Sequence, residues 1–472
     1  MSKQKKALTL SGKIVTGVVA GGLTLGAIYA LGIVNLPTVV RDPASATIDT
    51  TAASQSEIAC VGSVVEIGFD PANPLSIQDI GEAQIVQFSS DSAPLDSFLI
   101  DRVGVSEPNP AAQPTAASLS AQERSTSAIV QSQTVESETV RGYTASACAP
   151  SLAESWLVAG STVLGSSSLV LLTNPGDVTA NVTLTVYSEQ GLVDAPGSSN
   201  LVVEPKTQRV ISLNGLAPNI NASVIHVQSR GGKIAAALQQ TLSQGIDATG
   251  LETSTAVAAP SQNPLIPGIR VVAAGTDHAH DDHDDSARVL RLFSPVNKNS
   301  TVKAIAYGAD GYSQDLGTFE VTPLMVNEYV LPELPEGVYT VGLETEDPML
   351  GSVRLTSEGA NGVYDIAAFQ AAQAFEGPMA VAVPSGPNPI LSLYNPKASN
   401  ATVNLTRGDS PQTITVPGGG AVQVSLEEGA GYGLDASAPI VAGVSLANSG
   451  AISGYLVEPP ATDAEPLTVY TR

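Results

Sequence analysis

Short segments in which apolar and polar residues alternate recur along most of this chain. Three of them begin at Val182, Val302 and Val403, each seven residues after a proline. Alternation with a period of two residues predicts a strand that buries one face and exposes the other. The pattern therefore predicts an all-β fold built from many short strands.

The three prolines belong to a repeated motif, Leu-x-[Asn/Ser]-Pro, which ends at Pro175, Pro295 and Pro396. The motif recurs after 120 and then 101 residues. A unit of about 100 residues with about seven short strands is typical of an immunoglobulin-like β-sandwich. A β-propeller is disfavoured because its blades repeat at about 40 to 50 residues. We expect tandem sandwiches with these prolines at structural core positions.

The composition shifts along the chain predict an order of parts. We expect a cytoplasmic basic tail (1–13), a transmembrane helix (14–34), a linker (35–57), an N-terminal β unit (58–151) containing a low-complexity loop (107–138), three sandwiches (152–265, 266–376 and 377–460) and a C-terminal tail (461–472).

The first part of the chain predicts a membrane anchor. Four lysines precede the uncharged run 14–34, which has 21 residues. At helical rise this run spans about 30 Å, the thickness of a bilayer core, and the basic flank should remain in the cytoplasm. We expect a single-pass plasma-membrane protein with its C-terminal part extracytoplasmic. The alternative is a cleaved signal peptide and a secreted form.

The only two cysteines, Cys60 and Cys148, fall in the exported part. An even number of cysteines outside the cytoplasm predicts a disulfide, which would stabilise the fold by about 4 to 5 kcal/mol in the loop-entropy model. Between them, residues 107–138 are rich in Ser, Thr, Ala, Gln and Pro, which predicts a surface loop. Trp156, the single tryptophan, is expected to be a core anchor near Cys148; the alternative is a platform on which a sugar stacks.

These features resemble a family of actinobacterial envelope proteins of unknown function. The resemblance rests on the basic N-terminus with one apolar segment, on Cys148-Ala-Pro followed by Trp156-Leu-Val-Ala-Gly160, and on Leu169-x-Leu-x-x-Asn-Pro175 leading to the Val182 strand. It extends from the predicted anchor to about Pro460. It implies a location in the cell envelope and a fold, and no activity.

Composition and charge narrow the functional classes. The chain has 21 Lys and Arg against 45 Asp and Glu, a net charge of −24, which excludes a nucleic-acid partner because phosphate binding requires basic residues. The 43 Gly and 32 Pro agree with many turns. We find no Gly-x-Ser-x-Gly elbow, P-loop or His-Glu-x-x-His motif, so we predict no enzyme and no catalytic residues.

The densest polar chemistry lies between 277 and 285, which holds three of the four histidines. Imidazole and carboxylate groups are ligands for divalent transition metals. The candidate ligands are His278, His280, Asp281, His283 and Asp285. The alternative is a solvated acidic loop with incidental metal affinity, because a preformed site needs rigid support around its ligands.

Three hypotheses follow. The leading one is a non-enzymatic, membrane-anchored scaffold or interaction protein with an envelope protein or cell-wall partner. The alternative is a metal-binding or metal-delivery protein that uses the loop 277–285 and a divalent metal as its only cofactor. The third is a wall-modifying enzyme whose acidic residues the sequence does not identify.

The metal hypothesis predicts that substituting His278, His280 and His283 together by alanine abolishes micromolar zinc binding, since three of the candidate ligands are lost. Isothermal titration calorimetry of the intact protein and the triple variant measures this. Zinc binding that survives the substitution would exclude these histidines as ligands.

Overall fold

The computed structural model describes most of the chain after residue 55. The described residues are 19, 22–23, 45–48, 56–68, 76–90, 95–105, 108–120, 123–272, 288–359, 364–459 and 467–470. Contacts divide the chain into a large unit, residues 50–465, and a small one, residues 1–49 with 466–472. Among the described residues, no helix is long and apolar enough to cross a membrane. Apart from residues 19, 22 and 23, the predicted anchor 14–34 lies outside them.

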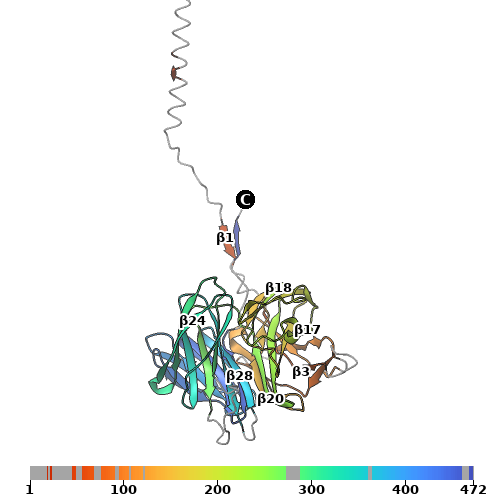
Figure 1. The fold of residues 1–472 in the computed structure, drawn as a ribbon. Helices are drawn as coiled ribbons and strands as arrows, with labels where there is room; N and C mark the ends of the chain where they lie inside the picture. Colours follow the sequence, from red (N-terminus) through yellow and green to blue (C-terminus); the bar gives the residue numbers. More distant parts are fainter. Residues whose placement is uncertain are drawn as a thin grey trace, which may run out of the picture. The chain divides into compact units, whose positions relative to one another are not determined.

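The small unit contains one antiparallel pair, β1 (Ser45–Ile48) with β36 (Leu467–Tyr470), in which Ser45 faces Tyr470 (Figure 1). The two strands lie within the stretches predicted as linker (35–57) and C-terminal tail (461–472). Both sequences, Ser-Ala-Thr-Ile and Leu-Thr-Val-Tyr, alternate with period two, which favours a strand over a coil.

Within the large unit, the N-terminal part (residues 56–150) forms three small sheets. Their strand orders are β10-β9-β5, β11-β2-β8-β6 and β3-β4. The strands are β2 (Ser56–Ala59), β3 (Val64–Ile67), β4 (Ile77–Ile80), β5 (Gln84–Ser89), β6 (Asp96–Leu99), β7 (Asp101–Arg102), β8 (Thr115–Leu119), β9 (Ser127–Glu136), β10 (Arg141–Ala147) and β11 (Ala149–Pro150), with one helical turn, α2 (Glu123–Thr126).

The prediction that 107–138 is a surface loop is wrong, because β8 and β9 lie within it. The stretch lacks charge between Thr126 and Val135, and its Ser, Thr, Gln and Ala side chains are small or can hydrogen-bond. Gln131 Oε1 accepts from the Gly62 N–H and Gln133 Oε1 from the Val64 N–H, at 3.0 and 2.9 Å. Buried amides that pair with backbone groups make a polar strand stable in the interior.

The rest of the large unit consists of three consecutive segments. Segment 1 contains β12 (Glu154–Leu157), β13 (Ser166–Asn174), β14 (Ala180–Ser188), β15 (Gly191–Leu192), β16 (Leu201–Val203), β17 (Thr207–Ser212), α3 (Leu213–Leu216), β18 (Val224–Gly231), β19 (Ala235–Gln244) and β20 (Asp247–Thr255). Segment 2 contains β21 (Leu265–Val271), β22 (Val289–Phe293), β23 (Ser300–Tyr307), η1 (Ala309–Gly311), β24 (Ser313–Val321), β25 (Val326–Val330), β26 (Gly337–Glu344), β27 (Leu350–Glu358) and β28 (Tyr364–Gln370). Segment 3 contains β29 (Phe375–Ala382), β30 (Ile390–Tyr394), β31 (Ala401–Arg407), β32 (Ser410–Val416), β33 (Ala421–Ser425), β34 (Gly431–Asn448) and β35 (Ala451–Val457).

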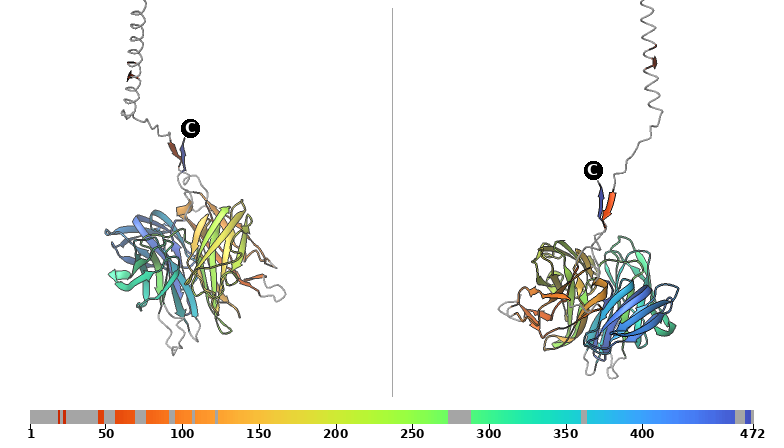
Figure 2. Two further views of the ribbon diagram at one scale, coloured as in Figure 1. Left: turned by 45° about the horizontal axis from the view of Figure 1, so that its top comes forward. Right: turned by 180° about the vertical axis from the view of Figure 1, so that it is seen from behind.

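The three segments have the same strand order in two sheets each. One sheet runs β12-β18-β14-β15, β21-β26-β23-β24 and β29-β34-β31-β32 in the successive segments. The other runs β20-β19-β13-β17, β28-β27-β22-β25 and β35-β34-β30-β33. In segment 3 the single long strand β34 takes part in both sheets, where the other segments use two strands. Figure 2 shows the segments in yellow-green, teal and blue.

Each segment encloses one hydrophobic cluster, to which both of its sheets contribute. Val182, Val302 and Val403 are fully buried, and the alternate residues that follow them also lie in the clusters: Leu184, Val186, Ala304, Ala306 and Leu405. The all-β prediction is confirmed, and the alternation identified these strands correctly.

Neighbouring parts of the large unit are joined in a closed circuit. The N-terminal β7 pairs in parallel with β17 of segment 1. Arg291 of segment 2 donates to the carbonyls of Gly160 and Ser223 in segment 1, and Gln423 of segment 3 donates to the carbonyl of Val338 in segment 2. Segment 3 then returns to the N-terminal part, where Val130, Tyr143 and Ala145 lie in its hydrophobic cluster. Each of the four parts therefore contacts at least two others.

One buried carboxylate joins these parts. Asp365 on β28 accepts hydrogen bonds from the backbone N–H of Tyr143 on β10 and of Ile452 on β35, both at 3.0 Å, and of Leu251 on β20 at 3.1 Å. Burial raises the pKa of the Asp365 carboxyl well above its ordinary value, and the N–H donors oppose the rise. The side chain thus links the N-terminal part to all three segments; β20 and β28 lie side by side in Figure 1.

The predicted disulfide between Cys60 and Cys148 is confirmed. It lies in a small hydrophobic cluster with residues of β2, β8 and β9. It therefore closes the N-terminal part just before segment 1 begins.

We expect Asp365→Ala to lower the free energy of unfolding by at least about 3 kcal/mol, because three buried backbone donors lose their acceptor. Urea unfolding monitored by circular dichroism measures the loss. Asp435→Ala removes an exposed aspartate and should change stability by less than about 0.5 kcal/mol. Equal stability of the two variants would contradict a central role for Asp365.

The pH dependence of the free energy of unfolding should also show the raised pKa of the Asp365 carboxyl. Its pKa is higher in the folded than in the unfolded protein, so its contribution to stability is complete below the unfolded-state pKa and is lost as pH rises through the folded-state pKa. The stability difference between the native protein and Asp365→Asn should therefore be largest in acid and decrease from about pH 4 upward. A difference that grows with pH would mean that the pKa is lowered.

Candidate binding groove

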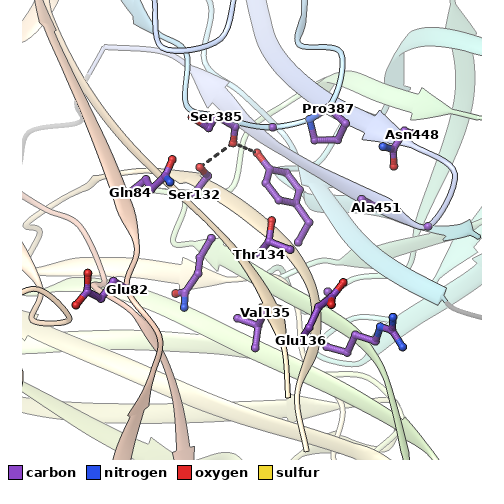
Figure 3. Close-up of a pocket in the computed structure, with 16 residues that line it drawn as sticks. Glu82, Gln84, Ser132, Thr134, Val135, Glu136, Ser385, Pro387, Asn448 and Ala451 are labelled. Atoms are coloured by element: carbon purple, nitrogen blue, oxygen red, sulfur yellow. Dashed lines mark hydrogen bonds between the residues drawn. The ribbon is translucent and has the colours of Figure 1, made fainter. Parts of the chain in front are cut away.

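A groove of about 480 Å³ lies where the N-terminal part meets segment 3 (Figure 3). We call it the Tyr143 groove. It is lined by residues of β5, β9 and β10, by the loop after β29 and by the turn between β34 and β35. The lining residues are Glu82, Gln84, Ser132, Gln133, Thr134, Val135, Glu136, Arg141, Gly142, Tyr143, Ser385, Gly386, Pro387, Asn448, Gly450 and Ala451.

Two hydroxyl groups fix one wall of the groove. The Tyr143 hydroxyl and Ser132 Oγ both donate to the carbonyl oxygen of Ser385, each at 2.8 Å (Figure 3). Burial raises the pKa of Tyr143, so the phenol stays protonated and donates. The loop after β29 is thereby held against the β9–β10 hairpin.

Two glycines allow this close approach. A Cβ at position 386 would lie 1.9 Å from the Tyr143 hydroxyl oxygen, so only glycine fits there. Gly142 has a φ of +145°, and a Cβ there would lie 2.4 Å from Asp365 Oδ1. The groove is therefore built directly over the Asp365 junction.

The open side of the groove carries polar side chains. Asn109 donates to Glu82 Oε1 at 3.1 Å. The Gln133 amide accepts from the Val64 N–H and donates to the Ile80 carbonyl. Five other side chains form no hydrogen bond or ion pair with any residue that the structure describes: Gln84, Thr134, Glu136, Arg141 and Asn448. Glu136 and Arg141 are cross-strand neighbours without an ion pair.

The groove has an excess of negative charge. Glu82 and Glu136 line it, and Glu428 lies beside it, accepting from the Gly386 N–H at 3.4 Å. Arg141 is the only basic residue among the lining residues. The site therefore combines amides, hydroxyls and carboxylates with one guanidinium.

The predicted metal ligands His278, His280, Asp281, His283 and Asp285 lie outside the described residues, between β21 and β22. Their metal binding remains a prediction. Among the residues that the structure does describe, no group of three or more His, Cys, Asp or Glu side chains could hold a metal ion.

The fourth histidine, His226 on β18, makes a local contact. Its Nε2 lies 2.7 Å from Glu154 Oε1, and its ring stacks on Trp156 with centroids 3.9 Å apart. Trp156 is buried, but it packs with Phe293 and Leu350 of segment 2. The Cys60–Cys148 disulfide, near which Trp156 is expected, belongs to a different hydrophobic cluster.

The three motif prolines do not share a core position. Pro175 is buried, Pro295 is half-buried and Pro396 is exposed. The preceding residues, Asn174, Ser294 and Asn395, are the fully buried ones.

Their side chains explain this burial. Asn174 Nδ2 donates to the carbonyls of Val178 and Val203, and Asn395 Nδ2 to those of Ser399 and Val416. The asparagine therefore organises the turn, and the proline only ends the strand.

Sequence reasoning missed the Tyr143 groove. Its residues come from five separated stretches, and part of them lay in the region interpreted as a loop. One signal in the sequence could have indicated a β-hairpin here. In the uncharged run that contains Ile129 and Val130, apolar and polar residues alternate weakly before Tyr143.

Comparison with known protein families matches residues 103–427 to one described as a family of unknown function (DUF5719). The matched range includes the groove residues 132–136, 141–143 and 385–387. No curated protein matches the chain.

We expect Tyr143→Phe to destabilise the protein by about 1 kcal/mol, since Ser385 keeps its bond from Ser132. Combining it with Ser132→Ala should cost more than the sum of the single changes, because the carbonyl then loses both donors. Urea unfolding of the four proteins measures the coupling. Tyr312→Phe, whose hydroxyl bonds Gln314 in segment 2, is the matched control and should not couple with Ser132→Ala. Additive effects at Tyr143 and Ser132 would contradict the shared acceptor.

Proposed function

We propose that this chain, which belongs to the family of unknown function (DUF5719), is a non-enzymatic, membrane-anchored interaction protein of the bacterial cell envelope. The observation that carries the proposal is the Cys60–Cys148 disulfide. Disulfides persist in oxidising compartments and are rare in the cytoplasm, which favours export of residues 56–459.

The anchor in this proposal is the uncharged run 14–34, with the basic tail 1–13 on the cytoplasmic side. Its length matches a bilayer core of about 30 Å. A secreted form cleaved after this run is the alternative. Tethering would confine the large unit to the membrane surface and raise its effective concentration for other envelope components.

The fold in this proposal is a tandem array of immunoglobulin-like sandwiches at 152–265, 266–376 and 377–460. Support comes from the identical strand orders and the one hydrophobic cluster per segment. Such paired sheets are common in cell-surface proteins that act by binding.

The partner in this proposal is another envelope protein or a cell-wall component. The chain's net charge of −24 disfavours anionic partners. The Tyr143 groove supports a binding role because its walls are fixed by hydrogen bonds, which reduces the entropy lost when a partner binds.

Labelling of single cysteines with a membrane-impermeant maleimide tests the orientation. Leu164 is fully exposed, so Leu164→Cys should react in intact cells that express the full chain. Ser2→Cys, in the basic tail, is the matched control and should react only after the cells are permeabilised. Labelling of Ser2→Cys alone in intact cells would overturn the proposal. A purified protein that lacks its first residues would favour the secreted form.

A further inference from the structure

We propose that the Tyr143 groove binds an uncharged saccharide, recognised through its hydroxyl groups. This inference rests on the proposed function and names the chemistry of its partner. The recognising side chains are Gln84, Thr134 and Asn448, with Glu136 and Arg141 at the rim.

The size and rigidity of the groove fit a small ligand. Its volume of about 480 Å³ lies within the range of small-molecule sites, about 300 to 1,000 Å³. The hydrogen bonds from Tyr143 and Ser132 to Ser385 hold its two sides together without a ligand. The site is therefore largely formed in advance.

The hydrogen-bonding capacity of the groove fits a sugar. An amide offers two donors and an acceptor, a threonine hydroxyl offers both roles, a carboxylate only accepts and a guanidinium only donates. Sugar hydroxyls each donate and accept, so a ligand with several hydroxyls can satisfy such a mixed set. Pro387 and Ala451, which are both half-buried, add apolar surface against which the C–H groups of a sugar ring can pack.

The charge of the groove disfavours acidic ligands. Glu82, Glu136 and the neighbouring Glu428 outnumber Arg141. A carboxylate or phosphate would be repelled by three like charges and attracted by one opposite charge. Uronic acids and phosphorylated sugars should therefore bind poorly.

The backbone of the groove disfavours an extended peptide. A peptide usually adds to a free strand edge, where it pairs with unpaired backbone groups. In the middle of β10, two N–H groups that face away from β9 are already used. Tyr143 N–H donates to Asp365 and Ala145 N–H donates to Ser453 Oγ. Recognition in this groove therefore depends on side chains.

A glycan array with neutral, uronic-acid-containing and sialylated oligosaccharides tests the inference on the full chain in phosphatidylcholine nanodiscs. We expect binding to neutral glycans and none to acidic ones. Saturation-transfer NMR with the best neutral glycan then measures affinity. Binding to no glycan, or to acidic glycans alone, would overturn the proposal.

Paired variants locate the site. Thr134→Val with Asn448→Ala removes two exposed groove side chains that make no internal hydrogen bond among the described residues, so the fold should be retained. We expect affinity for the neutral glycan to fall by about tenfold or more. Thr318→Val with Asn299→Ala makes the same changes on segment 2 and should leave affinity unchanged. Equal affinity of the two double variants would place binding elsewhere and overturn the inference.

The two proposals fail independently. Maleimide labelling reports the location of the chain in cells, whereas the array reports binding by the purified protein. A cytoplasmic position with glycan binding would overturn only the envelope function. An extracytoplasmic position without glycan binding would overturn only the ligand.

Discussion

The architecture depends on one carboxylate that three separate strands share. Asp365 accepts from backbone N–H groups of β10, β20 and β35, and it is contributed by β28. Edge strands of sheets normally leave such groups facing solvent or another chain. Here β10, β20 and β35 each direct one backbone N–H group inward, and the Asp365 side chain on β28 accepts a hydrogen bond from each of them. The arrangement joins small sheets that would be weakly stable alone.

The N-terminal part is held in position by its contacts with segments 1 and 3. Its β7 covers the edge of β17, while β10 contacts segment 3. The groove lies where this part meets segment 3, and Gly142 connects its floor to Asp365. The site therefore exists only because the first and last parts of the large unit pack against each other.

The sequence predicted individual strands and the disulfide well, but it did not predict which other distant residues come into contact. Alternation from Val182, Val302 and Val403 identified β14, β23 and β31, because burial of one sheet face requires that period. The disulfide followed from cysteine count and compartment. By contrast, β9 was interpreted as a loop, since its Gln and Ser residues look hydrophilic and their burial depends on backbone partners 69 residues away. Asp365 has no distinguishing neighbours in sequence, and its partners lie 222, 114 and 87 residues distant. No local pattern encodes such contacts.

The closed circuit has a consequence for the order in which the chain acquires its structure. Ala145 N–H and Ser453 Oγ are hydrogen-bonded across 308 residues. A chain that is synthesised from its N-terminus presents β10 long before β35 exists. Early parts of a growing chain can fold as units, but contacts of such separation form only after the loop entropy between them has been overcome. Apolar residues such as Val130 and Ala145 therefore remain uncovered until segment 3 has been synthesised, and the groove cannot form before then.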